Sequence, residues 1–133
     1  MNSIWYMPII WGSMNEPARK IPVVFYRTRA GVEVVRNWLR DLDDEDRNIV
    51  GQDLMRVQFR WPVGMPLCRP LGDGLWEVRS NLTGNRIARN RIARVFFCFT
   101  VDRILALHGI IKKIQATPAA DLELARKRKR EFK

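Results

Sequence analysis

The sequence contains a single histidine and two cysteines, so it has few of the side chains that bind transition metals or form disulfide frameworks. Cys68 and Cys98 are far apart in the chain and neither has metal-ligand spacing around it, which argues against a zinc site. Both thiols lie among apolar residues, as reduced core cysteines do. This pattern predicts a cytoplasmic protein that needs no metal or other cofactor.

Long apolar runs are also missing. The apolar stretch at residues 4–11 is shorter than the roughly 20 residues that cross a bilayer, and no basic segment precedes it as in a secretion signal. We therefore expect no membrane partner. Residues 1–20 are interpreted as an N-terminal extension, either vestigial or packed on the domain or on another chain. Residues 21–133 are interpreted as one domain.

Acidic residues are scarce in the second half of the chain. The net charge is +10 over 133 residues, but residues 1–53 hold 7 basic and 8 acidic side chains, whereas residues 54–120 hold 11 basic and 3 acidic ones. Hydrophobic residues make up 47% of the chain, which excludes a disordered protein. A basic field of this kind favours a polyanion such as RNA or DNA as the partner.

Hydrophobic periodicity and turn signals predict the element order β-α-α-β-β-β-β-α. Thr117 is expected to cap the last helix, with Pro118 at its first position. The order is typical of an α+β fold, a single mostly antiparallel sheet with two N-terminal helices and a C-terminal basic helix, with helices on a face of the sheet. The expected strands are 21–27, 66–71, 75–80, 92–100 and 104–111, and the expected helices are 31–42, 43 or 44 to 61, and 118–132.

A five-residue segment is repeated in tandem, since Asn-Arg-Ile-Ala-Arg occupies residues 85–89 and again residues 90–94. Five is an odd number, so exchanging one copy for the other in a strand would turn every side chain to the opposite face. We expect the second copy to form the strand, because it continues directly into Val95–Phe99. The first copy would then place Arg86 and Arg89 in an exposed loop.

Three apolar runs in the second half end in, or are framed by, cations: Leu75–Arg79, Arg94–Phe99 and Leu105–Lys113. Strands rich in β-branched and aromatic residues are buried, whereas arginine and lysine stay near water or an anion. The runs therefore predict a sheet whose rim is a cluster of positive charge.

These runs also carry a family resemblance. Leu75-Trp76-Glu77-Val78-Arg79, Arg94 at the start of the next strand, Leu107-His108-Gly109-Ile110-Ile111-Lys112-Lys113, Gln115-Ala116-Thr117-Pro118 and Leu122–Arg128 together resemble the phage-derived, HigB-like branch of the RelE/HigB toxin superfamily. The match covers roughly residues 21–130. It implies a RelE-like fold and the toxin of a type II toxin-antitoxin system, a ribosome-dependent mRNA endonuclease. Its implied partners are the ribosome with its mRNA and a cognate antitoxin, often of the helix-turn-helix type.

The resemblance implies catalytic roles for Arg79, Arg94, Lys112 and Lys113. Cleavage of RNA without a metal uses the 2′-hydroxyl of the substrate as nucleophile, so the enzyme must orient the backbone, stabilise charge on phosphorus and move protons. Arginine suits charge stabilisation, because its planar fork binds two phosphate oxygens and keeps its charge. Arg91 replaces Arg94 as the candidate if the duplication shifts the register.

Other candidates have structural as well as functional interpretations. Glu77 shares a strand face with Arg79, so it either orients that arginine or forms an ordinary ion pair. His108 is either a core histidine or a minority catalytic candidate, and Trp76 is either a core anchor or a base-stacking platform. RNA contact is expected from basic residues of the repeat and of the last helix: Arg86, Arg89, Arg91, Arg126, Lys127, Lys129 and Arg130.

The sequence departs from better-known relatives in its proton-transfer residues. Several relatives have a tyrosine or histidine near the C-terminal end, but both tyrosines here, Tyr6 and Tyr26, come early. An alternative function is therefore a catalytically impaired module that binds RNA, the ribosome or an antitoxin. A DNA-binding function rests on charge alone, since no recognition-helix signature supports it.

Overall fold

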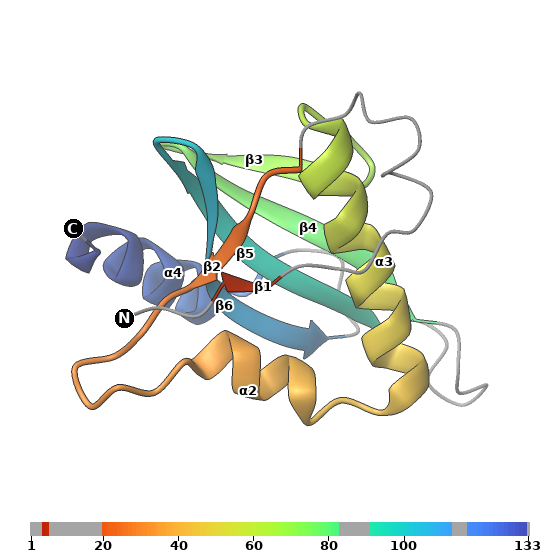
Figure 1. Cartoon of the computed structure of the whole chain (residues 1–133), viewed down its shortest axis with the longest axis horizontal. Coiled ribbons are helices and arrows are strands. Elements are labelled where there is room, and N and C mark those ends of the chain that lie inside the picture. Colours follow the sequence, from red (N-terminus) through yellow and green to blue (C-terminus); the bar gives the residue numbers. More distant parts are fainter. Residues whose placement is uncertain (1–3, 6–19, 83–90, 113–116, 133) are drawn as a thin grey trace.

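The computed structural model describes residues 4–5, 20–82, 91–112 and 117–132. The described strands form one sheet in the order β1-β2-β6-β5-β4-β3 (Figure 1). The pairing of β2 with β6 is parallel and the other pairings are antiparallel. The elements are β1 (Ile4–Trp5), β2 (Val23–Phe25), α2 (Val34–Arg40), α3 (Asp44–Arg60), β3 (Cys68–Gly72), β4 (Leu75–Asn81), β5 (Ile92–Thr100), β6 (Arg103–Lys112) and α4 (Ala119–Glu131).

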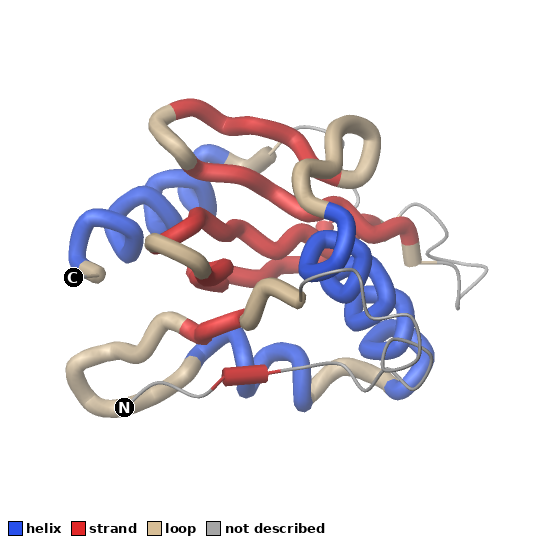
Figure 2. The backbone as a smooth tube through the Cα atoms, turned by 45° about the horizontal axis from the view of Figure 1, so that its top comes forward, coloured by secondary structure: helices blue, strands red, loops and turns tan. Residues whose placement is uncertain are grey.

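The sheet has helices on both faces. Helices α2 and α3 cover the face that carries Val78, Val95 and Phe97. Helix α4 covers the opposite face, where Ala125 packs with Phe96 and other residues of the sheet. Figure 2 shows α3 and α4 on opposite sides of the strands. The α+β class and the mostly antiparallel sheet are confirmed, whereas the expectation of helices on a single face is wrong. Successive residues of a strand point to opposite faces of the sheet, and here both faces carry apolar side chains. Each face must therefore be covered by a helix.

Several element boundaries differ from the sequence-based predictions: β2 and α2 are shorter than expected, β3 begins and ends later, and α4 begins and ends one residue inside the expected range. Helix α4 begins at Ala119 after Pro118, which has extended backbone dihedrals and occupies the capping position, and no side chain caps the helix. The expected capping role of Thr117 is therefore wrong, because its hydroxyl donates a hydrogen bond to Glu77 instead. The β5–β6 turn consists of Val101 and Asp102, and β6 begins at Arg103, one residue before the expected strand 104–111.

The second copy of the repeat forms the strand, as predicted. Strand β5 begins at Ile92, and Arg94 pairs with Arg79 of β4 in the antiparallel register. Arg91 lies just before the strand and makes two hydrogen bonds, at 3.0 and 3.2 Å, to the carboxylate of Asp46 in the first turn of α3. The first copy, with Arg86 and Arg89, lies outside the described residues.

Helix α2 approaches the sheet closely at Gly109 of β6. A Cβ atom added at Gly109 would lie 2.5 Å from Cε3 of Trp38 in α2, closer than van der Waals contact allows. The indole ring therefore rests on bare backbone, and the space above residue 109 exists only because glycine has no side chain.

We expect Gly109→Ala to lower the free energy of unfolding by about 1–3 kcal/mol, because the new methyl group must displace the Trp38 ring or shift α2. Urea denaturation followed by circular dichroism measures this. Gly64→Ala is the matched control, since a Cβ there meets nothing within 4 Å, and it should change stability by less than about 0.5 kcal/mol. Equal stability of the two variants would contradict the packing described for Trp38.

Candidate cationic site on the α4 face of the sheet

A carboxylate surrounded by guanidinium groups lies beyond the N-terminal end of α4. Glu77 Oε1 is 3.3 Å from Nε of Arg94, and Glu77 Oε2 is 4.0 Å from both Nη1 of Arg69 and Nε of Arg79. The hydroxyl of Thr117 donates a hydrogen bond of 3.0 Å to Glu77 Oε1. We call these five residues the Glu77 cluster. One carboxylate thus serves three arginines, and the side chains of the cluster have a net charge of +2.

The strand register explains why these residues meet. Arg69 of β3 pairs with Glu77 of β4, and Arg79 of β4 pairs with Arg94 of β5. Directly paired residues point to the same face of a sheet, and so do residues two apart on one strand. Three strands therefore place three arginines around Glu77. The result agrees with the predicted shared face of Glu77 and Arg79.

The arginines of the cluster differ in burial. The side chains of Glu77 and Arg94 are fully buried, whereas Arg79 is 16% exposed and Arg69 is 40% exposed. Burial lowers the pKa of the Arg94 guanidinium, Glu77 raises it, and the neighbouring Arg79 and Arg69 lower it further. Arginine keeps its charge despite such a shift. An incoming anion can thus reach Arg79 and Arg69 directly, while Arg94 stays paired with Glu77 beneath them.

Lys112 lies on the same face of the sheet. It pairs with Ile92, two residues before Arg94 on β5, and it is exposed at the end of β6. Sheet spacing puts its Cα roughly 12 Å from that of Arg79, two strands and two residues away. Two long cationic side chains can close such a gap around one phosphate group. Lys113 lies outside the described residues.

Two of the arginines expected to bind RNA hold the fold together. Arg91 is bound to Asp46, and this contact raises the pKa of Arg91. Arg126 of α4 donates hydrogen bonds to the carbonyl oxygens of Leu71 and Gly72 at the end of β3. The remaining described candidates, Lys127, Lys129 and Arg130, lie on the second half of α4.

His108 is held between the sheet and α4. Its Nε2 is 2.7 Å from Oδ1 of Asp121, its Nδ1 is 3.4 Å from Nη1 of Arg128, and its ring stacks on Phe96. These contacts fit a structural histidine that anchors the helix. Trp76 points to the opposite face from Glu77 and packs edge-on against Trp61, as a core anchor does.

Sequence reasoning missed Arg69 and Thr117 as members of the cluster. The sequence predicts the strand that holds Arg69 but not the register of that strand with β4, because the pairing contains a bulge between Pro70 and Gly72. Thr117 was missed because a threonine followed by proline at the start of a helix is typical of a helix cap. A signal was available for Arg69: a basic residue in an edge strand next to a strand that carries a single acid.

Two further findings concern membrane-spanning helices and metal-binding groups. None of the helices in the described part of the chain has the length and apolar character needed to span a bilayer. Within the same residues, histidine, cysteine and carboxylate side chains form no group of three that could hold a metal ion.

Comparison with known proteins gives one family. A search of curated proteins found no match. Residues 37–130 match the family described as phage-derived protein Gp49-like (DUF891), and this range includes β3 to β6, most of α4 and every residue of the Glu77 cluster. The match covers more than half of the chain. The protein therefore belongs to the Gp49-like family of phage-derived proteins.

Proposed function

We propose that this protein is the toxin of a type II toxin-antitoxin system, of the HigB-like branch of the RelE superfamily, and that it cleaves mRNA on the ribosome. One observation supports this most strongly: the partly exposed side chains of Arg79 and Arg69 converge on the buried Arg94–Glu77 pair. A net positive cluster of forked donors suits a phosphodiester whose negative charge increases in the transition state. A helix-turn-helix antitoxin is the expected partner.

In the proposed reaction the 2′-hydroxyl of the substrate attacks the adjacent phosphorus. The P–O5′ bond breaks, so the products are a 2′,3′-cyclic phosphate and a new 5′-hydroxyl. The 2′-hydroxyl loses its proton, and the leaving 5′ oxygen gains one. Arg79 binds the non-bridging oxygens, whose charge grows as the fifth bond to phosphorus forms, and Arg69 binds the neighbouring backbone.

The remaining members of the site act indirectly or from the rim. Arg94 has no exposed surface in its pair with Glu77, so it acts as a positioning residue that fixes the carboxylate beside Arg79. Lys112 lies on the same face and supplies a second phosphate contact, with Lys113 next to it in sequence. A rigid pair beneath the reactive arginine keeps it in place before substrate arrives, and such preorganisation is a large part of electrostatic catalysis.

The test uses purified protein and ribosomes that carry a defined message with an open A site. We expect cleavage within the A-site codon, seen as new 5′ ends, with cyclic phosphate at the upstream 3′ end. The reaction is stopped by removing magnesium, and primer extension then maps the new 5′ ends. Treatment with polynucleotide kinase identifies the cyclic phosphate at the upstream 3′ end. Message that stays intact at stoichiometric protein would overturn the enzymatic proposal.

The second candidate is a binding module without catalysis. One observation favours it: the only tyrosine and histidine among the described residues, Tyr26 and His108, are bound to Glu131 and Asp121 rather than to the Glu77 cluster. The same assay separates the two functions. Protein that sediments with ribosomes but leaves the message intact, and that does not arrest growth when overproduced, supports the binding module.

A further inference from the structure

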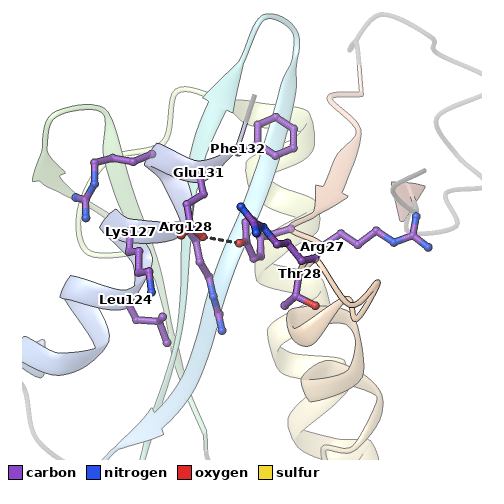
Figure 3. A pocket seen from close by; sticks show the side chains of 10 residues that line it. Arg27, Thr28, Leu124, Lys127, Arg128, Glu131 and Phe132 are labelled. Carbon is purple, nitrogen blue, oxygen red and sulfur yellow. Dashed lines mark hydrogen bonds between the residues drawn. The ribbon is translucent and has the colours of Figure 1, made fainter.

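A cleft lies at the other end of α4, away from the Glu77 cluster. One wall is formed by residues 26–29, which follow β2, and the other by the second half of α4 (Figure 3). Its volume is about 770 Å³, which lies within the usual range of roughly 300–1,000 Å³ for ligand sites. Its lining residues are Tyr26, Arg27, Thr28, Arg29, Leu124, Lys127, Arg128, Arg130, Glu131 and Phe132.

The cleft is strongly basic. Five of its ten lining residues are cations and one is an acid, which gives a net charge of +4. The carboxylate is already engaged, because Glu131 accepts a hydrogen bond of 2.9 Å from the hydroxyl of Tyr26, drawn as the dashed line in Figure 3. Cations stand on both walls and four of them are exposed: Arg27 and Arg29 on one side, Lys127 and Arg130 on the other.

The base of the cleft is built from fixed side chains. Arg128 donates a hydrogen bond of 2.8 Å to the carbonyl oxygen of Leu107, and its guanidinium lies 5.5 Å from the centre of the Tyr26 ring. Tyr26 is itself buried against the sheet. The contacts of Tyr26 with Arg128 and Glu131 join α4 to the segment after β2, so the two walls that carry the exposed cations are linked to each other.

The cleft is separate from the Glu77 cluster. Helix α4 has 13 residues and is about 20 Å long, with Thr117 next to Glu77 at one end and the cleft at the other. The first half of the helix carries Asp121, which is bound to His108, and the exposed Glu123. The cleft and the Glu77 cluster thus lie at opposite ends of α4, where they can contact different parts of one partner.

We propose that this cleft is a docking site for the phosphate backbone of folded RNA, distinct from the site of cleavage. Arginine clusters also bind acidic peptide motifs, and such a peptide could pack here on Leu124, Phe132 and the ring of Tyr26. Four exposed cations on two walls suit closely spaced phosphates better. The inference rests on the proposed function in taking RNA as the ligand, and it adds where structured RNA, such as that of the ribosome, is held.

The experiment measures binding of a fluorescent RNA hairpin with a stem of about 20 base pairs at several salt concentrations. Two double variants remove the exposed cations of each wall: Arg27→Ala with Arg29→Ala, and Lys127→Ala with Arg130→Ala. Each phosphate contact that is lost should reduce the slope of log Kd against log salt by about one. We expect each double variant to weaken hairpin binding at least tenfold at physiological salt.

The matched control is Arg36→Ala with Arg40→Ala, which removes the same charge from exposed positions of α2 that do not line the cleft. The control variant should lose less than half as much of the wild-type salt slope as either cleft variant loses. A control that weakens binding as much as the cleft variants overturns the proposal, and so does a polyglutamate peptide that binds the cleft more tightly than the hairpin. Thermal melts should show all three variants folded, since every substituted side chain is exposed.

The failure of this proposal can be told apart from the failure of the proposed function. Wild-type protein that leaves message intact, while hairpin binding still depends on the cleft, would overturn the nuclease and support the cleft. Protein that cleaves message while the cleft variants bind the hairpin with the wild-type salt slope would support the nuclease and overturn the cleft proposal.

Discussion

Replacement of Glu77 by alanine should lower the free energy of unfolding by about 3–5 kcal/mol, because it leaves the fully buried guanidinium of Arg94 without its carboxylate. The same change removes the acceptor for the hydroxyl of Thr117 and leaves Arg69, Arg79 and Arg94 facing one another. The repulsion among these arginines and the loss of the carboxylate that compensates the buried charge of Arg94 both destabilise the folded protein. Urea denaturation at pH 7 measures the loss.

Two further variants separate charge pairing from side-chain volume. Asp41→Ala removes an exposed ion pair with Arg40 at 3.8 Å and should cost less than about 1 kcal/mol. Combining Glu77→Leu with Arg94→Met removes both buried charges and should recover most of the stability, since apolar residues of similar volume often replace a buried pair without loss. Glu77→Ala with stability within 1 kcal/mol of wild type would contradict the burial described for this pair.

The recovered double variant also tests function. It should fold, but it should cleave message poorly, because the carboxylate beside Arg79 is gone and the reactive guanidinium has lost its fixed neighbour. Restored folding together with full activity would show that Glu77 and Arg94 serve the fold alone.

The sequence identified the segments that become β4 and β5 and the copy of the repeat that joins the sheet. The odd length of the repeat required a choice between its two copies, and continuity with Val95–Phe99 selected the second. That choice brought Arg94 into register with Arg79. Alternation along β4 then put Glu77 on the same face. The residue-by-residue register of β4 with β5 was not predicted and comes from the structure.

Features that depend on long-range packing were not accessible in the same way. The bulge between Pro70 and Gly72 sets the register of β3, and no pattern in the sequence fixes its position. The hydroxyl of Thr117 had two possible uses, and the buried carboxylate of Glu77 takes precedence over a helix end that water can satisfy. Contact of Trp38 with Gly109 joins elements that are 71 residues apart.

Net charge was a poor guide to which cations bind RNA. Arg91 and Arg126 lie in the predicted basic segments, yet both are used to join elements of the fold. Arg27 and Arg29 lie in the half of the chain with no excess of positive charge, yet they line the basic cleft. Burial and pairing therefore decide which of the many cations remain available to a polyanion.

Arg79→Ala should reduce the rate of message cleavage by about 10²–10³-fold, the usual cost of removing one preorganised donor from a site where negative charge develops. Arg79 pairs directly with the buried Arg94 in the sheet, and its side chain is 16% exposed, so its guanidinium can reach the phosphate oxygens. Arg79→Lys keeps the charge but loses the fork and should give an intermediate rate. Single-turnover cleavage on programmed ribosomes measures all three proteins.

The loss should appear in the rate and not in ribosome affinity, because the additional negative charge that Arg79 stabilises develops only in the transition state. Sedimentation with ribosomes should therefore change by less than about threefold, and Arg36→Ala, an exposed arginine of α2 on the other face of the sheet, should leave both quantities unchanged. In cells, the arrest of growth should disappear with Arg79→Ala and persist with Arg36→Ala. Cleavage by Arg79→Ala at the wild-type rate would remove this arginine from the reaction, and with it the strongest reason to place catalysis at the Glu77 cluster.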